Sequence, residues 1–247
     1  MRQRFSTHRT GFGDRDASAV TPYEAACQIK YSTWPLAGTT VVNEGLAGAT
    51  YNGTSAANTY TLLKTGASAF TFNGSTDKVT THKGTAINNL TPVTFEWIIY
   101  RNIAGNSMLW SKQTPMMLYE YVLDANGTFD MARVSTEGAY TQWKSAAGVI
   151  PNTAWSFIQW AWSYGTGPDD EGTPILKVNN VPRTMTKSGT THALWDSDAS
   201  YDAELGHRFL ADMSFTGTIA LQRIHNAILN DSQLTRNYYA DRWRVPQ

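Results

Sequence analysis

The sequence is poor in cysteine, in charged residues and in long apolar runs, and each scarcity excludes a class of protein. Cys27 is the single cysteine among 247 residues, so no disulfide can form within the chain. Lysine and arginine together number 20, and aspartate and glutamate also number 20. This balance argues against a general electrostatic grip on nucleic acid or on an anionic membrane. No apolar run approaches the roughly 20 residues that cross a bilayer.

The first twenty residues are polar and carry four arginines, Arg2, Arg4, Arg9 and Arg15. One interpretation is a disordered tail. The other, which we adopt as the hypothesis, is an assembly arm that lies on a partner subunit. The same stretch lacks the apolar core of a signal peptide. We therefore expect the chain to be made and kept in the cytoplasm, unless lysis or a particle carries it out.

Two capping boxes predict short helices near the ends of the chain. Thr21, Pro22 and Glu24 have the types expected at the N-cap and first turn of a helix, which predicts a helix over 22–30. Asn230 followed by Gln233 predicts a second helix over 231–242, with Leu234 and Tyr238 on its buried side. The predicted organisation is an arm and helix over 1–30, a body over 31–229, and a helix and tail over 230–247.

The body reads as β-structure. Asparagine–glycine pairs at 52–53, 73–74 and 126–127 supply the positive-φ residues of tight turns. Between such turns lie short alternating segments, among them SAFTFNG, VTFEWIIY, SMLWSK, PILKVNNV and GTIALQRIHNAIL. Roughly a dozen strands at this spacing favour an antiparallel sandwich over βαβ units. The predicted fold class is all-β, a two-sheet antiparallel jelly-roll sandwich.

One segment, WSFIQWAWSY from Trp155 to Tyr164, raises the question of whether its aromatic rings face a ligand or the core. A period of two places Ile158, Trp160, Trp162 and Tyr164 on one face of a strand. That face is wholly apolar or aromatic, and the opposite face is mixed. We interpret the aromatic face as the inside of the sandwich, with a sugar-binding platform as the alternative.

The order of several segments resembles the laminin-G-like domains of the concanavalin A-like lectin/glucanase superfamily. The segments that carry the resemblance are YSTWPLAG, AFTFNGSTDKVTT, LTPVTFEWIIY, NTAWSFIQWAWSY, PILKVNNVPRTMT and FTGTIALQRIHNAILNDSQL, and they cover about residues 31–240. The resemblance implies a jelly roll with a curved sheet on which relatives bind glycans or proteins. Many relatives carry an acidic residue after the isoleucine of the F-x-G strand, whereas Ala220 follows Ile219 here.

The sequence gives no support for catalysis. The superfamily's glucanases place their carboxylates in an E-x-D-x-x-E or E-x-D-x-E string, and neither string occurs. Glu120 and Asp124 share strand parity without matching that spacing. The five histidines are scattered, which argues against a zinc site. We therefore expect a protein that is not an enzyme.

Two kinds of ligand site remain as hypotheses. Exposed aromatic rings flanked by polar residues can stack on sugars, and the candidates for glycan binding are Tyr140, Trp143, Trp195 and Tyr201. Calcium prefers several carboxylate and carbonyl oxygens, and its candidates are Asp77, Asp169 and Asp170. For each candidate the alternative is a structural role, as a ring folded over the sandwich or an acid in a solvated turn. No other cofactor is expected.

The main functional hypothesis is a non-catalytic structural and binding protein of a virus particle, as a capsid decoration, fibre or tail component of a tailed phage. This hypothesis joins a lectin-like sandwich to an arginine-bearing arm, and it places the chain in the virion. The expected partners are other virion or assembly proteins, with cell-surface glycans as a second class, and neither nucleic acid nor membrane. The alternative is a stand-alone carbohydrate-binding module, followed by a glycoside hydrolase.

Overall fold

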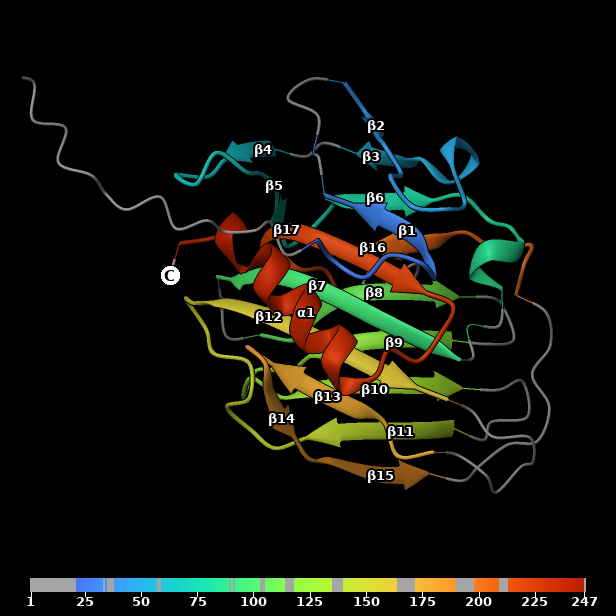
Figure 1. Ribbon diagram of the computed structural model, residues 1–247, viewed down its shortest axis with the longest axis vertical. Helices are drawn as coiled ribbons and strands as arrows, with labels where there is room; N and C mark the ends of the chain where they lie inside the picture. The colour runs from blue at the N-terminus through green and yellow to red at the C-terminus, as the bar shows by residue number, and fades with distance from the viewer. Residues whose placement is uncertain are drawn as a thin grey trace, which may run out of the picture.

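The computed structural model describes residues 21–32, 34, 38–56, 59–88, 90, 92–102, 105–113, 118–134, 140–163, 172–189, 198–208 and 213–246, with residues 113, 118–122, 133, 134 and 140 described by their backbone. These residues form two antiparallel β-sheets and one α-helix near the C-terminus (Figure 1). No helix in this part of the chain is long and apolar enough to cross a membrane.

The first sheet has eight strands, in the spatial order β14-β13-β12-β7-β17-β5-β4, with β1 also paired to β17. Its strands are β1 (Cys27–Tyr31), β4 (Thr59–Leu62), β5 (Ser68–Asn73), β7 (Val93–Arg101), β12 (Trp155–Trp162), β13 (Ile175–Val178), β14 (Val181–Arg183) and β17 (Thr216–His225). Strand β17 pairs with β7 on one side, and its other side pairs with β5 at the start and with β1 at the end. A register shift after Ile219 separates these two pairings.

The second sheet has nine strands, in the order β15-β11-β10-β9-β8-β16-β6-β3-β2. Its strands are β2 (Thr40–Val41), β3 (Gly53–Ala56), β6 (Lys78–Thr81), β8 (Ser107–Gln113), β9 (Leu118–Leu123), β10 (Phe129–Val134), β11 (Tyr140–Ser145), β15 (Met185–Gly189) and β16 (Ala203–Leu205). Short 3-10 turns occur at η1 (Ala49–Tyr51), η2 (Thr85–Ile87) and η3 (Arg242–Arg244). The predicted two-sheet antiparallel sandwich is confirmed.

The turn predictions hold at two of the three asparagine–glycine pairs. Gly127, with φ 73°, lies in the tight turn that joins β9 to β10, and Gly74, with φ 76°, lies in the turn between β5 and β6. Gly53 instead begins strand β3. A Cβ at Gly53 would lie 2.4 Å from a methyl group of Val79, so close packing rather than a turn explains this glycine.

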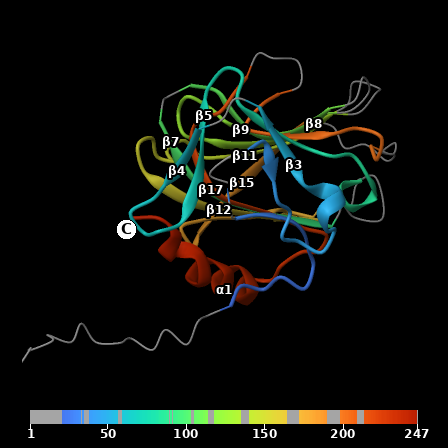
Figure 2. The same cartoon turned by 90° about the horizontal axis from the view of Figure 1, so that it is seen from above.

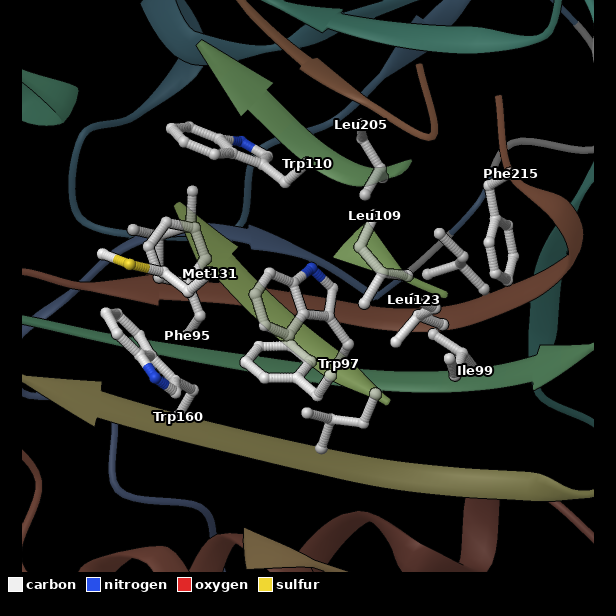
Figure 3. Close-up of a cluster of buried hydrophobic side chains, with 14 of the residues drawn as sticks. Phe95, Trp97, Ile99, Leu109, Trp110, Leu123, Met131, Trp160, Leu205 and Phe215 are labelled. Carbon is white, nitrogen blue, oxygen red and sulfur yellow. The ribbon is translucent and has the colours of Figure 1, made fainter. Parts of the chain in front are cut away.

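Aromatic side chains fill the space between the sheets. Trp97 of β7 stacks on Phe95 of the same strand, with ring centroids 5.0 Å apart. Trp110 of the second sheet meets Phe95 edge-on, also at 5.0 Å (Figure 3). All three side chains are fully buried. Burying rings of this size is the main favourable contribution to folding for a sandwich without a disulfide.

Strand β12 answers the question about the Trp155 segment. Ile158, Trp160 and Trp162 are buried in the main hydrophobic core, which confirms the interpretation of the aromatic face. The opposite face is also buried, at Phe157, Gln159 and Ala161, because helix α1 packs over it. The rings of the aromatic face therefore form no surface platform, and Tyr164 lies outside the described residues.

Helix α1 (Asp231–Asp241) confirms the C-terminal prediction. Asn230 Oδ1 accepts the backbone N–H of Gln233 at 3.0 Å, and Gln233 Oε1 accepts the N–H of Asn230 at 2.8 Å, which completes the capping box. Leu234 is fully buried and Tyr238 partly so. In both views the helix lies against strands β7, β12 and β17 of the first sheet (Figures 1 and 2).

The predicted helix over 22–30 is wrong, because residues 27–31 form strand β1. Cys27, Ile29 and Tyr31 are buried while Gln28 and Lys30 are partly exposed, the alternation of a strand with one buried face. Pairing with β17 supplies hydrogen-bond partners for the backbone N–H and C=O groups, which in a helix would bond to one another. The body of the sandwich therefore begins at Cys27 rather than at residue 31.

Buried charges hold α1 on the first sheet. Glu96 of β7 accepts hydrogen bonds from Arg223 Nη1 (3.1 Å), Asn237 Nδ2 (2.8 Å) and Gln159 Nε2 (2.8 Å), and its Oε2 lies 3.0 Å from His225 Nε2. Arg223 also donates to Asp241 at the end of the helix. Burial alone would raise the pKa of Glu96, but the His225 hydrogen bond and the Arg223 charge outweigh it and hold the pKa at about 2. Glu96 is therefore a carboxylate at neutral pH.

Candidate functional site

Trp143, the first candidate for sugar stacking, lies in the core. It occupies the centre of β11, opposite Met131 of β10 and Lys187 of β15, and only 5% of it is exposed. Its side chain belongs to the same hydrophobic cluster as Trp97 and Trp110. The prediction of an exposed ring at this position is wrong, because the strand alternation turns Trp143 inward.

Of the other aromatic candidates, Tyr201 is the one whose side chain the structure describes. Tyr201 is partly buried in the turn that precedes β16, where its N–H donates to the Asp198 carbonyl at 3.1 Å. Tyr140 begins strand β11, and its side chain lies outside the described set. Trp195 also lies outside the described residues. Of the four predicted glycan candidates, the structure therefore removes Trp143 as an exposed ring, and Trp195 stays a prediction.

Asp77, the calcium candidate within the described residues, is a turn residue. It is 3% exposed, and its Oδ2 accepts the N–H of Asn73 at 2.9 Å. Burial raises the pKa of Asp77. In the described part of the chain no group of three or more histidine, cysteine, aspartate or glutamate side chains is arranged to hold a metal ion. Asp169 and Asp170, like the arm residues Arg2, Arg4, Arg9 and Arg15, lie outside the described residues.

A row of nine residues, eight of them polar, crosses the outer face of the second sheet. The strand registers place nine residues directly opposite one another across all nine strands, at a spacing of about 4.8 Å. In spatial order the row is Thr40, Thr54, Thr80, Glu204, Ser111, Glu120, Ala132, Gln142 and Ser188. All but Ala132 are polar. On β3, β6, β8, β11 and β16 the residues on either side of the row are buried. Helix α1 lies on the other sheet (Figure 2).

The centre of this row is closed. Glu204 is 4% exposed, and its two oxygens contact Lys78 Nζ at 2.5 Å and His207 Nδ1 at 3.0 Å. Ser111 Oγ donates to the His207 carbonyl at 2.9 Å and is also buried. These polar groups are hydrogen-bonded to one another, so they connect β6, β8 and β16 and are not available to bind a ligand.

The open part of the face lies over β10, β11 and β15, and we call it the edge site. It consists of Asp130, Gln142, Lys144, Thr186 and Ser188. The registers pair Asp130 with Lys144, Lys144 with Thr186, and Gln142 with Ser188, so all five face outward together. Lys144, Thr186 and Ser188 are exposed, and the other two are partly exposed. Next to them lies an open cavity of about 510 Å³, lined by Lys144, Ser145, Ala146, Thr184, Thr186 and Ser188.

A chain of hydrogen bonds orders the edge site. Ser188 Oγ donates to Gln142 Oε1 at 3.1 Å, and Gln142 Nε2 donates to Asp130 Oδ2 at 2.7 Å. Asp130 Oδ1 is buried without a partner among the described residues. Burial raises the pKa of Asp130. Lys144 Nζ forms an ion pair with Asp124 Oδ2 at 3.2 Å. The site thus fixes carboxylate, amide, ammonium and hydroxyl groups side by side.

Sequence reasoning missed all five residues of the edge site. The signal was present, because FDMARV and YTQWKS alternate with a period of two. Once one parity faces the core at Met131 and Trp143, the other parity, with Asp130, Gln142 and Lys144, must face out. Thr186 and Ser188 could not have been added from the sequence, because nothing in it pairs β15 with β11.

Comparison with known proteins supports the fold. No protein-family model and no curated protein matches the sequence. Among solved structures, domain 4 of AbnA, a GH43 extracellular arabinanase from Geobacillus stearothermophilus solved in complex with arabinotriose, matches with a TM-score of 0.61 and 16% identity. The match covers 87% of this chain and 100% of that domain. The fold is thus a concanavalin A-like sandwich, as the resemblance implied.

Toxin binding domains share the same sandwich. The receptor binding domain of botulinum neurotoxin type G matches with a TM-score of 0.61 and 10% identity, over 87% of this chain and 51% of that chain. The binding domain of Paraclostridial Mosquitocidal Protein 1 matches with a TM-score of 0.60 and 11% identity, over 87% and 52%. This chain therefore spans about half of each toxin domain, and at these identities the likeness is one of fold.

Proposed function

We propose that the protein is a non-catalytic carbohydrate-binding domain and that the edge site on its second sheet holds the sugar. The observation that carries the proposal is the row of ordered polar groups, Asp130, Gln142 and Ser188, beside an open cavity. Sugar hydroxyls both donate and accept, and they require neighbouring groups that can do the same. The complex of the similar arabinanase domain with arabinotriose supports an oligosaccharide as the ligand class.

The geometry assigns a part to each side chain. Asp130 accepts a hydrogen bond from a sugar hydroxyl at Oδ1, which is buried and has no partner among the described residues and which becomes accessible when neighbouring side chains move. Lys144 donates to a ring or hydroxyl oxygen. Thr186 and Ser188 form the rim of the cavity. Because Gln142 is fixed at both ends of its amide, little side-chain entropy is lost on binding.

The proposal is tested by screening the full chain on a glycan array and measuring hits by isothermal titration calorimetry. The variant Gln142→Ala removes the donor to Asp130 and the acceptor for Ser188. We expect it to raise the Kd of any hit roughly 10-fold or more, since each hydrogen bond contributes about 1 kcal/mol. The matched control is Thr54→Ala, which removes an exposed polar group of the same polar row on β3.

The control is expected to leave the Kd within roughly twofold, because Thr54 lies at the far side of the sheet. Equal losses for Gln142→Ala and Thr54→Ala would place the ligand elsewhere and overturn the edge site. An array without hits at millimolar protein would overturn carbohydrate binding itself. Circular dichroism and unfolding curves of both variants check that each remains folded.

The role in a virus particle remains a prediction from the sequence. The similar structures are a domain of an extracellular arabinanase and binding domains of toxins, and they favour the alternative hypothesis of a carbohydrate-binding module. The assembly arm lies outside the described residues. Light-scattering masses of the full chain and of a chain without residues 1–20 test it, because an assembly arm requires an oligomer that is lost on deletion.

A further inference from the structure

A second cavity lies on the opposite side of the molecule from the edge site, between the first sheet and the C-terminal segment. Its volume is about 310 Å³, within the range of small-molecule sites. The sheet contributes Ile98, Trp155 and Phe157, and the C-terminal segment contributes Tyr238, Arg242, Val245 and Pro246. Ala154 and Asn179 complete the lining. The cavity exists because α1 ends and η3 turns away while the outer face of β12 continues.

Three of the nine residues that line the cavity are aromatic. Phe157 and Tyr238 pack against each other with centroids 5.6 Å apart, and Trp155 is held by Tyr100 at 5.5 Å. Trp155 and Tyr238 are partly exposed, so the rings reach the mouth of the cavity. Such walls attract a flat or saturated carbon ring.

The polar groups of the lining are mostly hydrogen-bond donors. Arg242 has no acceptor atom, and it is the one charged residue among those that line the cavity. The Oδ1 of Asn179 already accepts the N–H of Phe157 at 2.8 Å, which leaves its amide N–H groups for a ligand. The indole N–H of Trp155 also donates, and the Tyr238 hydroxyl does either. A ligand must therefore bring acceptors, and the charge of Arg242 favours an anion.

We propose that this cavity binds a small carboxylate that carries a carbon ring. The ring lies against Trp155, Phe157 and Tyr238, and the carboxylate meets the Arg242 guanidinium, for which bidentate carboxylate pairing is the preferred geometry. The guanidinium carbon of Arg242 lies 4.9 Å from the centroid of the Tyr239 ring, a cation–π contact that helps to order the side chain. A neutral sugar fits this lining less well, because the side-chain acceptors among the lining residues are limited to the Tyr238 hydroxyl and to Asn179 Oδ1, which already accepts from Phe157. This inference is independent of the edge site.

The test uses phenylacetate as the probe and calorimetry or saturation-transfer NMR on the full chain. Benzyl alcohol, which has the ring without the charge, and acetate, which has the charge without the ring, are the comparison probes. We expect phenylacetate to bind at least 10-fold more tightly than either. The variant Arg242→Gln is expected to weaken phenylacetate binding at least 10-fold and to leave benzyl alcohol unchanged.

The matched control is Arg236→Gln on α1, where the guanidinium donates to Thr21 and the residue does not line the cavity. It is expected to change the affinity for phenylacetate less than twofold. Absence of saturable binding by phenylacetate would overturn the proposal. So would equal affinities for phenylacetate and benzyl alcohol, or equal losses in the two arginine variants.

Discussion

Replacing Glu96 with glutamine tests how far one buried carboxylate holds the C-terminal helix on the sandwich. Glu96 Oε2 faces three donors, from Arg223, His225 and Asn237, whereas Oε1 faces one, from Gln159. A glutamine can place its amide nitrogen only where Oε1 was, opposite the Gln159 donor. The substitution thus removes a charge beside the buried Arg223 and sets two donors against each other. Breaking a buried charge pair costs about 3–5 kcal/mol.

The pH dependence gives an independent measure of the same interaction. The pKa of Glu96 is lowered from 4.5 to about 2 in the folded protein. A lowered carboxylate pKa stabilises the fold fully above the unfolded pKa, and this contribution is lost as the pH falls toward the folded pKa. The shift corresponds to roughly 3 kcal/mol. We therefore expect the free energy of unfolding of the native chain to fall between pH 4.5 and pH 2 by more than that of Glu96→Gln.

Urea denaturation followed by tryptophan fluorescence at pH 7, 4 and 3 measures both effects. Glu44→Gln is the matched control, because Glu44 pairs with Lys30 at 3.3 Å on a partly exposed surface. Exposed pairs contribute about 1 kcal/mol or less, and the control should lose no more. A loss below about 1 kcal/mol for Glu96→Gln at pH 7, with an unchanged m-value, would refute the reasoning.

Two further predictions concern single groups. Asn230→Ala removes the side chain that caps α1 and should lower the free energy of unfolding by about 1 kcal/mol, measured by the same urea curves; an unchanged midpoint would contradict it. Cys27 is 1% exposed and burial raises its pKa to about 12, so a thiol reagent at pH 8 should label the native chain far more slowly than the urea-unfolded chain. Complete labelling of the native chain within minutes would show that β1 opens readily.

Period-two patterns predicted the sandwich well because a strand with one buried face shows its alternation within a short stretch of sequence. The face with Ile158, Trp160 and Trp162 could be assigned to the core from its own sequence, as could the capping box at Asn230. The helix predicted over 22–30 failed because the capping pattern at Thr21 and Glu24 is local, while the pairing of β1 with β17 joins residues nearly 200 positions apart. Tertiary pairing overrode the local preference.

The candidate sites were hard to predict for a related reason. Both lie between segments that are distant in the sequence, with β11 beside β15 at one and β12 beside Tyr238 and Arg242 at the other. Trp143 was chosen because its neighbours are polar, yet those neighbours, Gln142 and Lys144, are the residues that face solvent. In a strand, polar residues on both sides of an aromatic residue are as compatible with a side chain that faces the core as with one that faces solvent.

The length of α1 explains why a cavity is present on the outer face of the first sheet. A helix of eleven residues is about 16 Å long. The seven strands of the first sheet that are hydrogen-bonded one after another from β14 to β4 span about 29 Å across the sheet. The buried charges of Glu96, Arg223 and Asp241 fix the helix over the middle of the sheet, so it cannot slide to cover the rest. Near its C-terminal end the helix leaves Trp155, at the start of β12, only partly buried, and the cavity lies there. The second sheet has no such helix over β10, β11 and β15 among the described residues, and its edge keeps polar groups in reach of a ligand.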